Sequence, residues 1–101
     1  MSSGLKVLVV GDRFHNPLFR SAGLETVEAE GLEDVAEKIR AADRSGEYAV
    51  IIVLKHLVGD EQELRRRIQD VATTVLVLPT RWSPGEPVNI DKLIASALGL
   101  G

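Results

Sequence analysis

The segment Val7-Leu8-Val9-Val10, followed at once by Gly11-Asp12, decides the fold that this sequence is expected to adopt. An unbroken apolar run that is mostly β-branched is typical of a strand buried on both faces, so we expect a central strand of a parallel sheet. Tyr48–Leu54 is the most apolar run in the chain, and the same reasoning predicts a second strand in the middle of the sheet.

Two further strands are expected outside this central pair. Leu24–Ala29 alternates apolar with polar residues, as an edge strand with one solvated face does. Thr73–Leu78 is a mainly apolar segment that Pro79 ends, and it is expected to be the fourth strand.

Helices are expected between the strands, because the intervening segments place apolar residues at helical spacing. Asn16 is expected to cap the first helix, with Pro17 in its first turn and Gly23 as its stop. Asp60 is expected to cap the third. The same spacing predicts the second helix over Leu32–Ala42 and a last one over Ile90–Leu98.

The regular alternation of strands and helices predicts an α/β fold. We expect a four-stranded parallel sheet of order 2-1-3-4 with helices on both faces, a flavodoxin-like or Rossmann-like three-layer sandwich. The 101 residues, 45% hydrophobic and 27% charged, suit a single domain over 1–101. Its core is expected in 1–80, followed in 81–101 by a loop and a C-terminal amphipathic helix.

Composition excludes several functional classes. Without cysteine, the chain has no disulfide, thiolate metal site or thiol nucleophile. The net charge of −3 argues against nucleic acid as a partner. The longest apolar run, Ala49–Leu54, is far shorter than the ~20 residues that cross a bilayer, and the N-terminus does not resemble a signal peptide. The expected compartment is the cytoplasm.

Ligands of such sheets bind beyond the carboxyl ends of the strands, but the residues there indicate no catalytic or cofactor site. Gly11–Asn16 lacks the glycine and hydroxyl residues that wrap a phosphate, so no nucleotide cofactor is expected. His15 and His56 have no metal-ligand spacing around them, and we expect no metal. Asp12 is expected to hydrogen-bond loop amides and cap the first helix.

An alternative function stays open at the same sheet edge. Asp12, Lys55 and Thr80 follow strands as the functional residues of a phospho-acceptor receiver domain do, which is consistent with a degenerate receiver-like or small-ligand-sensing regulatory domain. The third strand, however, runs into Leu54-Lys55-His56 instead of an aspartate. A single carboxylate cannot hold the magnesium that phosphoryl transfer needs.

The order of motifs resembles the F subunit of archaeal/vacuolar-type (A-type/V-type) rotary ATPases over nearly the whole chain. The most specific pieces are Val9-Val10-Gly11-Asp12 and Phe19-Arg20-Ser21-Ala22-Gly23-Leu24. A Pro79-terminated strand, a Pro/Gly loop and the closing segment from Ile90 to Gly99 follow in the expected order. The sequence departs from the family at Phe14–Leu18, where a threonine-containing stretch is usual.

The resemblance implies a non-catalytic component of the central rotor stalk, with no catalytic residue, cofactor or metal. Its partner is the coiled coil of the D subunit, and through it the catalytic head and the membrane rotor. It contributes to rotary coupling of ATP synthesis or hydrolysis to ion transport, lies peripheral to the membrane without inserting, and has a mobile C-terminal segment. Apolar anchors with a polar rim are expected to bind this partner: Arg20, Arg81, Trp82, Ile90, Lys92, Leu93, Ile94 and Leu98.

Overall fold

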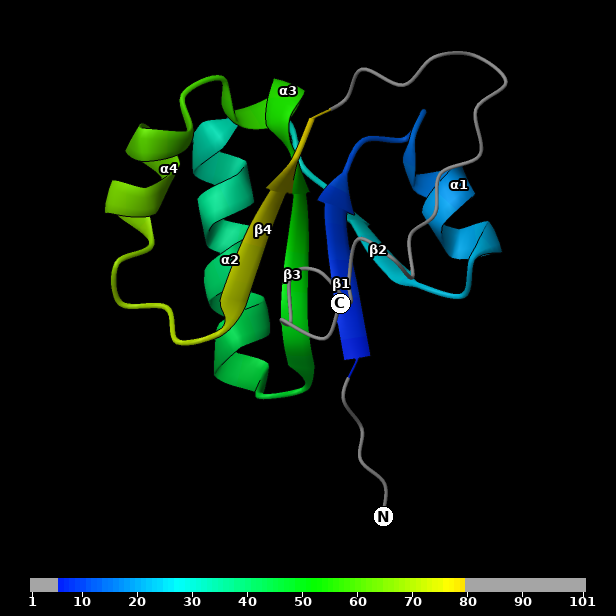
Figure 1. The fold of residues 1–101 in the computed structure, drawn as a ribbon, viewed down its shortest axis with the longest axis horizontal. Helices are drawn as coiled ribbons and strands as arrows, with labels where there is room; N and C mark the ends of the chain where they lie inside the picture. The colour runs from blue at the N-terminus through cyan, green and yellow to red at the C-terminus, as the bar shows by residue number, and fades with distance from the viewer. Residues whose placement is uncertain (1–5, 80–101) are drawn as a thin grey trace.

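The computed structural model describes residues 6–79, which form one parallel sheet with flanking helices (Figure 1). The sheet has four strands in the order β2-β1-β3-β4, so the predicted α/β class and strand order are confirmed. The elements are β1 (Lys6–Gly11), α1 (Asn16–Ser21), β2 (Glu25–Glu28), α2 (Leu32–Ser45), β3 (Tyr48–Leu54), α3 (Lys55–Val58), α4 (Glu61–Arg67) and β4 (Thr74–Leu78).

The two apolar strands β1 and β3 form the centre of the sheet, as their composition predicts. Val10 of β1 is paired with Val53 of β3, so the two strands end at the same level. The residues that follow them, Asp12 after β1 and Lys55 after β3, therefore begin at one common edge of the sheet. At that edge the β1–α1 loop and α3 lie close enough to meet.

Helices cover both faces of the sheet, as predicted. Because side chains alternate along a strand, β1 and β3 send one set of residues to each face. One buried cluster packs under α2 and α4 and includes Leu8 and Ile51, while the other packs under α1 and includes Val9 and Phe19. Figure 1 shows α2 and α4 beside the β3–β4 half of the sheet and α1 beside β2.

The start of α1 differs from the prediction. Asn16 is not the N-cap: His15 occupies that position without a side-chain cap, and Asn16 is the first residue of the helix. The Asn16 side chain points inward, is 1% exposed and donates a hydrogen bond from Nδ2 to the carbonyl of Val27 in β2, at 3.2 Å. The Asn16 side chain therefore makes a tertiary hydrogen bond to β2 instead of capping its own helix.

Gly11 explains how Asn16 fits there. A Cβ atom on Gly11 would overlap Asn16 Oδ1 and lie 2.9 Å from Leu54 Cδ1. The glycine that ends β1 is therefore required for close packing of the first helix against the sheet. Its backbone conformation is not the reason, since Gly11 has no positive φ.

The other helix boundaries follow the sequence signals closely. The Asp60 side chain caps α4 by accepting a hydrogen bond from the Gln62 N–H at 2.9 Å, as predicted. Gly23, with a φ of +89°, follows the end of α1 as the predicted stop. The single turn α3 lies directly after β3, where no helix was predicted.

The predicted loop and amphipathic helix over 81–101 lie outside the described residues. Within 6–79, no helix is both long and apolar enough to pass through a lipid bilayer.

Candidate functional site

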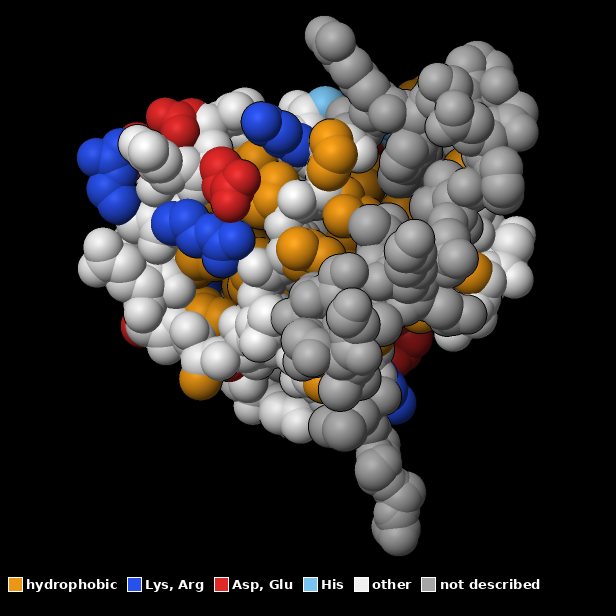
Figure 2. Space-filling view, in the orientation of Figure 1, with side chains coloured by type: hydrophobic (Ala, Val, Ile, Leu, Met, Phe, Trp, Pro, Cys, Tyr) orange, Lys and Arg blue, Asp and Glu red, His pale blue; other side chains and the backbone are white. Residues whose placement is uncertain are grey.

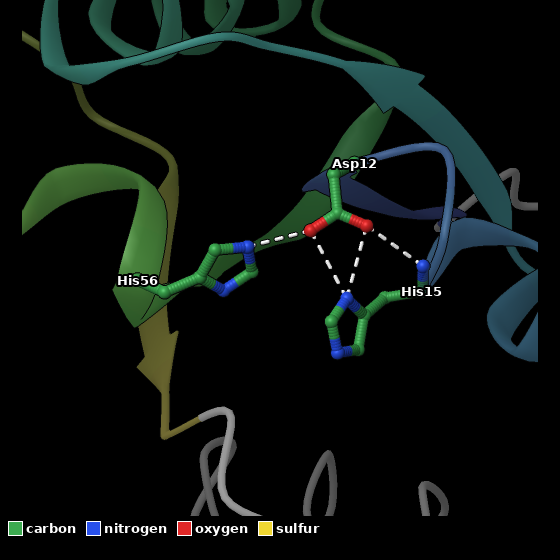
Figure 3. Close-up of side chains that lie close together, drawn as sticks. All are labelled: Asp12, His15 and His56. Carbon is green, nitrogen blue, oxygen red and sulfur yellow. Dashed lines mark hydrogen bonds and ion pairs between the residues drawn. The ribbon is translucent and has the colours of Figure 1, made fainter.

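Three side chains meet at the carboxyl edge of the sheet (Figure 3). Asp12 follows β1, His15 precedes α1, and His56 lies in α3. His15 Nδ1 is 2.9 Å from Asp12 Oδ1 and 3.0 Å from Oδ2. His56 Nε2 is 2.5 Å from Asp12 Oδ2, and the centroids of the two imidazole rings are 5.2 Å apart. We refer to these three residues as the Asp12 cluster.

The Asp12 carboxylate is held in place by its own loop. Oδ1 accepts hydrogen bonds from the backbone N–H groups of Phe14 and His15, both at 2.8 Å. This Asx-type turn confirms that Asp12 hydrogen-bonds loop amides, although its side chain does not cap α1. Oδ1 is thus oriented by the backbone and also contacts the His15 ring, whereas Oδ2 contacts both imidazole rings.

The environment of Asp12 favours its ionised form. Partial burial alone would raise the pKa of this carboxyl, but hydrogen bonds from the His15 ring and N–H, the His56 ring and the Phe14 N–H outweigh it and lower the pKa to about 2. Only 18% of the Asp12 side chain is exposed to solvent. The cluster therefore consists of an ionised, oriented carboxylate in contact with two imidazole rings.

The cluster was not predicted, because the sequence neighbours of His15 and His56 carry no sign of it. Asp12 and His56 are 44 residues apart, and no local spacing relates them. The signal was nevertheless present, since the predicted strand order places β1 beside β3 and hence Asp12 and His15 close to residues that follow Leu54. The unexpected turn α3 then brings His56, and not Lys55, to the carboxylate.

The contacts of Asp12 bear on the receiver-like alternative. In a receiver site, the acidic residues after the first strand bind magnesium, but both oxygens of Asp12 here accept hydrogen bonds from imidazoles or amides. Lys55 is exposed, and Thr80 lies outside the described residues. The arrangement therefore offers two nitrogen ligands and one carboxylate, the ligand chemistry of a transition metal more than of magnesium.

Of the predicted partner-binding residues, the structure places only Arg20, which is exposed in the last turn of α1. The remaining seven lie in the part of the chain that is not described: Arg81, Trp82, Ile90, Lys92, Leu93, Ile94 and Leu98. Near Arg20 in sequence, Phe14 and Leu18 are large hydrophobic residues exposed by 76% and 57%. Neither was predicted to bind a partner, because the exposure of a side chain in the β1–α1 loop or on so short a helix cannot be predicted from spacing.

Charged and apolar side chains are separated on the face shown in Figure 2. Lys/Arg and Asp/Glu side chains gather over α4, and hydrophobic side chains are visible along β4 next to them. The α4 charges are largely paired within the helix, for example Arg65 with Glu61 at 3.3 Å and Arg66 with Glu63 at 3.2 Å. Because of this pairing, the arginines of α4 do not form a basic patch.

Comparison with known proteins adds the deciding observation. The family model described as ATP synthase (F/14-kDa) subunit matches residues 7–94, which is most of the 101-residue chain. The chain belongs to the ATP synthase F-subunit family. The match covers nearly all of the described sheet, from β1 to β4, and it confirms the resemblance to the F subunit of archaeal/vacuolar-type rotary ATPases. No individual curated protein matches the sequence.

Family membership sets the cellular context of this F subunit. It is an accessory component of an ATP synthase, a membrane-associated complex that couples ATP synthesis and ion transport.

Proposed function

We propose that this F subunit is a non-catalytic component of the central rotor stalk that binds the coiled coil of the D subunit and contributes to rotary coupling. The observation that carries the proposal is the family match over residues 7–94. The match includes the segment with Ile90, Leu93 and Ile94, which is the proposed apolar centre of the contact.

The described fold suits a component that must transmit force. Three strand pairings join all four strands into one parallel sheet, and the central β-branched residues Val50, Ile51 and Ile52 are fully buried. Closely packed interiors deform little and transmit strain. Such a domain can resist twisting of the stalk while a small set of anchors holds it to the coiled coil.

Arg20 is proposed to lie on the polar rim of that contact. It is exposed, and so is Leu18 two residues before it, so α1 presents a charged and an apolar group to solvent. This combination is typical of an interface rim next to a hydrophobic centre.

The test is reconstitution of the complex from the full-length chain and the coiled coil of the matching D subunit. We expect a stoichiometric complex in size-exclusion chromatography and isothermal titration calorimetry. Leu93→Asp should abolish it, because a carboxylate would be buried at an apolar contact without a partner. Leu100→Asp makes the same chemical change outside the proposed anchors and should bind normally.

Two outcomes would contradict the proposal. If the unmodified chain fails to bind the D subunit, the stalk function is wrong. If Leu93→Asp unfolds the isolated chain, as judged by circular dichroism, Leu93 belongs to the core of the domain and the proposed anchors are wrong.

A further inference from the structure

The Asp12 cluster has a feature that stalk adhesion does not explain. Two imidazole nitrogens converge on one carboxylate oxygen from two different segments, the start of α1 and the turn α3. We propose that Asp12, His15 and His56 form a binding site for a divalent transition-metal ion of the zinc class, with Asp12 Oδ2, His15 Nδ1 and His56 Nε2 as its protein ligands.

The distances between the ligand atoms suit such an ion. One ligand atom from each residue can be chosen so that all three lie within 4.8 Å of one another. Ligands about 2.0–2.2 Å from a tetrahedral zinc are separated from each other by roughly 3.3–3.6 Å. The present nitrogen to Oδ2 distances of 3.0 Å and 2.5 Å would therefore have to widen by no more than about 1 Å.

The carboxylate is already oriented for this role. The Phe14 and His15 N–H groups hold Oδ1, and they can continue to do so while Oδ2 binds the ion. Hydrogen bonds of this kind to the second oxygen of a ligating carboxylate are the usual outer-shell support of a metal site. His56 is partly exposed, with 38% of its side chain accessible, so the ion has a route to the cluster.

The ligand set selects the class of ion. Imidazole nitrogens suit zinc, copper and nickel, whereas magnesium and calcium prefer oxygen ligands alone. Each ring must present a lone pair to the ion, so the ring nitrogen that contacts Asp12 must be unprotonated and the other ring nitrogen carries the proton. Three protein ligands leave a coordination position for water, and the ion would join the β1–α1 loop to α3 at the edge of the sheet.

The test uses the full-length chain without a histidine tag, because a tag would itself bind zinc. The chain has no cysteine, and its only two histidines are the proposed ligands, so no other histidine or cysteine competes for the ion. Zinc binding is measured against a chromophoric chelator at roughly 10 μM protein, and we expect uptake of one ion per chain. Cobalt(II) in place of zinc should give the visible absorption of a four-coordinate site. Magnesium alone should give no binding signal.

His56→Gln is the decisive variant, because this exposed side chain can be replaced without disturbing the core. It should weaken zinc binding by about 100-fold or more, beyond the 10–100-fold that loss of an outer-shell partner costs. Asp12→Asn should have a similar effect. Asp70→Asn makes the same change at an exposed carboxylate outside the cluster and should leave the affinity unchanged.

The proposal is overturned if the unmodified chain takes up no zinc. In that case the cluster only links the β1–α1 loop to α3 by hydrogen bonds. It is also overturned if folded His56→Gln, verified by circular dichroism, binds zinc as well as the unmodified chain. Because these measurements use the isolated chain, their result is independent of whether the D subunit is its partner.

Discussion

At the scale of single residues, Gly11 is a tightly constrained position. It ends β1, and its lack of a side chain lets Asn16 approach the sheet and hydrogen-bond to Val27. The Gly-Asp pair is one of the two specific pieces of the family resemblance. Close packing explains why a glycine is needed there, and the Asp12 turn explains the residue that follows it.

Replacing Gly11 with alanine should destabilise the domain by about 1–3 kcal/mol, the usual cost of overpacking a filled interior. The new methyl group would meet Asn16 Oδ1 and Leu54 Cδ1. Urea unfolding followed by circular dichroism measures the change.

Gly31→Ala is the matched control for Gly11→Ala. No atom lies within 4 Å of a Cβ placed on Gly31, and its φ of 170° is extended backbone that alanine can adopt. Gly31 is the N-cap of α2, so its replacement should cost a few tenths to about 1 kcal/mol. Equal losses of stability in the two variants would show that Gly11 is not constrained by packing.

At the scale of elements, Asp43 joins the end of α2 to the start of β4. Its Oδ1 accepts hydrogen bonds from the Ala72 N–H, the Thr73 N–H and the Thr73 hydroxyl, at 3.2, 3.1 and 2.7 Å. The Thr73 hydroxyl and N–H and the Ala72 N–H lower the pKa of Asp43 below its ordinary value, against a smaller opposing effect of burial. The charged form is therefore the one that the folded state favours.

This shift gives stability a defined pH dependence. Because the folded-state pKa is depressed, the contribution of Asp43 is fully present above the unfolded value of about 3.9 and is lost as the pH falls through the lower folded value. Asp43→Asn should lower the melting temperature by on the order of a few degrees at neutral pH, and its difference from the unmodified chain should shrink below about pH 4.

Differential scanning calorimetry between about pH 2 and 7 would test this prediction. Glu37→Gln, on an exposed position of the same helix, serves as the control and should show no such convergence. A difference between Asp43→Asn and the unmodified chain that stays constant with pH would contradict the prediction.

Most elements could be predicted from sequence because their signals are local. Continuous apolar runs identified β1 and β3, and Asp60 and Gly23 marked helix boundaries that the structure confirms. Asn16 was misassigned because a buried hydrogen bond to Val27 outweighed its capping preference. The turn α3 had no signal of its own, since a single helical turn after a strand has too few residues to show periodicity.

At the scale of the whole molecule, the strand order could be predicted but the cluster at its edge could not. Topology brings the end of β1 near the end of β3, yet only the path of α3 decides that His56 reaches Asp12. The exposure of Arg20, which is proposed to bind the D subunit, likewise depends on tertiary packing, because it is set by which side of α1 packs on the sheet.

The proposed rim position of Arg20 can be tested by charge reversal. Arg20→Glu should weaken binding to the D subunit severalfold, mainly through slower association, and the effect should diminish at high salt. Arg44→Glu is the control, because Arg44 is also an exposed arginine in the last turn of a helix, but belongs to α2. Surface plasmon resonance at two salt concentrations would measure both, and equal weakening by the two variants would count against a specific rim contact.

The edge strand β2 has a consequence for how copies of the molecule behave toward each other. It is only four residues long, and exposed Glu25 and Glu28 stand at its two ends. A second molecule that tried to extend the sheet there would find few backbone groups to pair with and would bring like charges together. We therefore expect this edge of the sheet not to pair with a second newly made copy before the chain joins its complex.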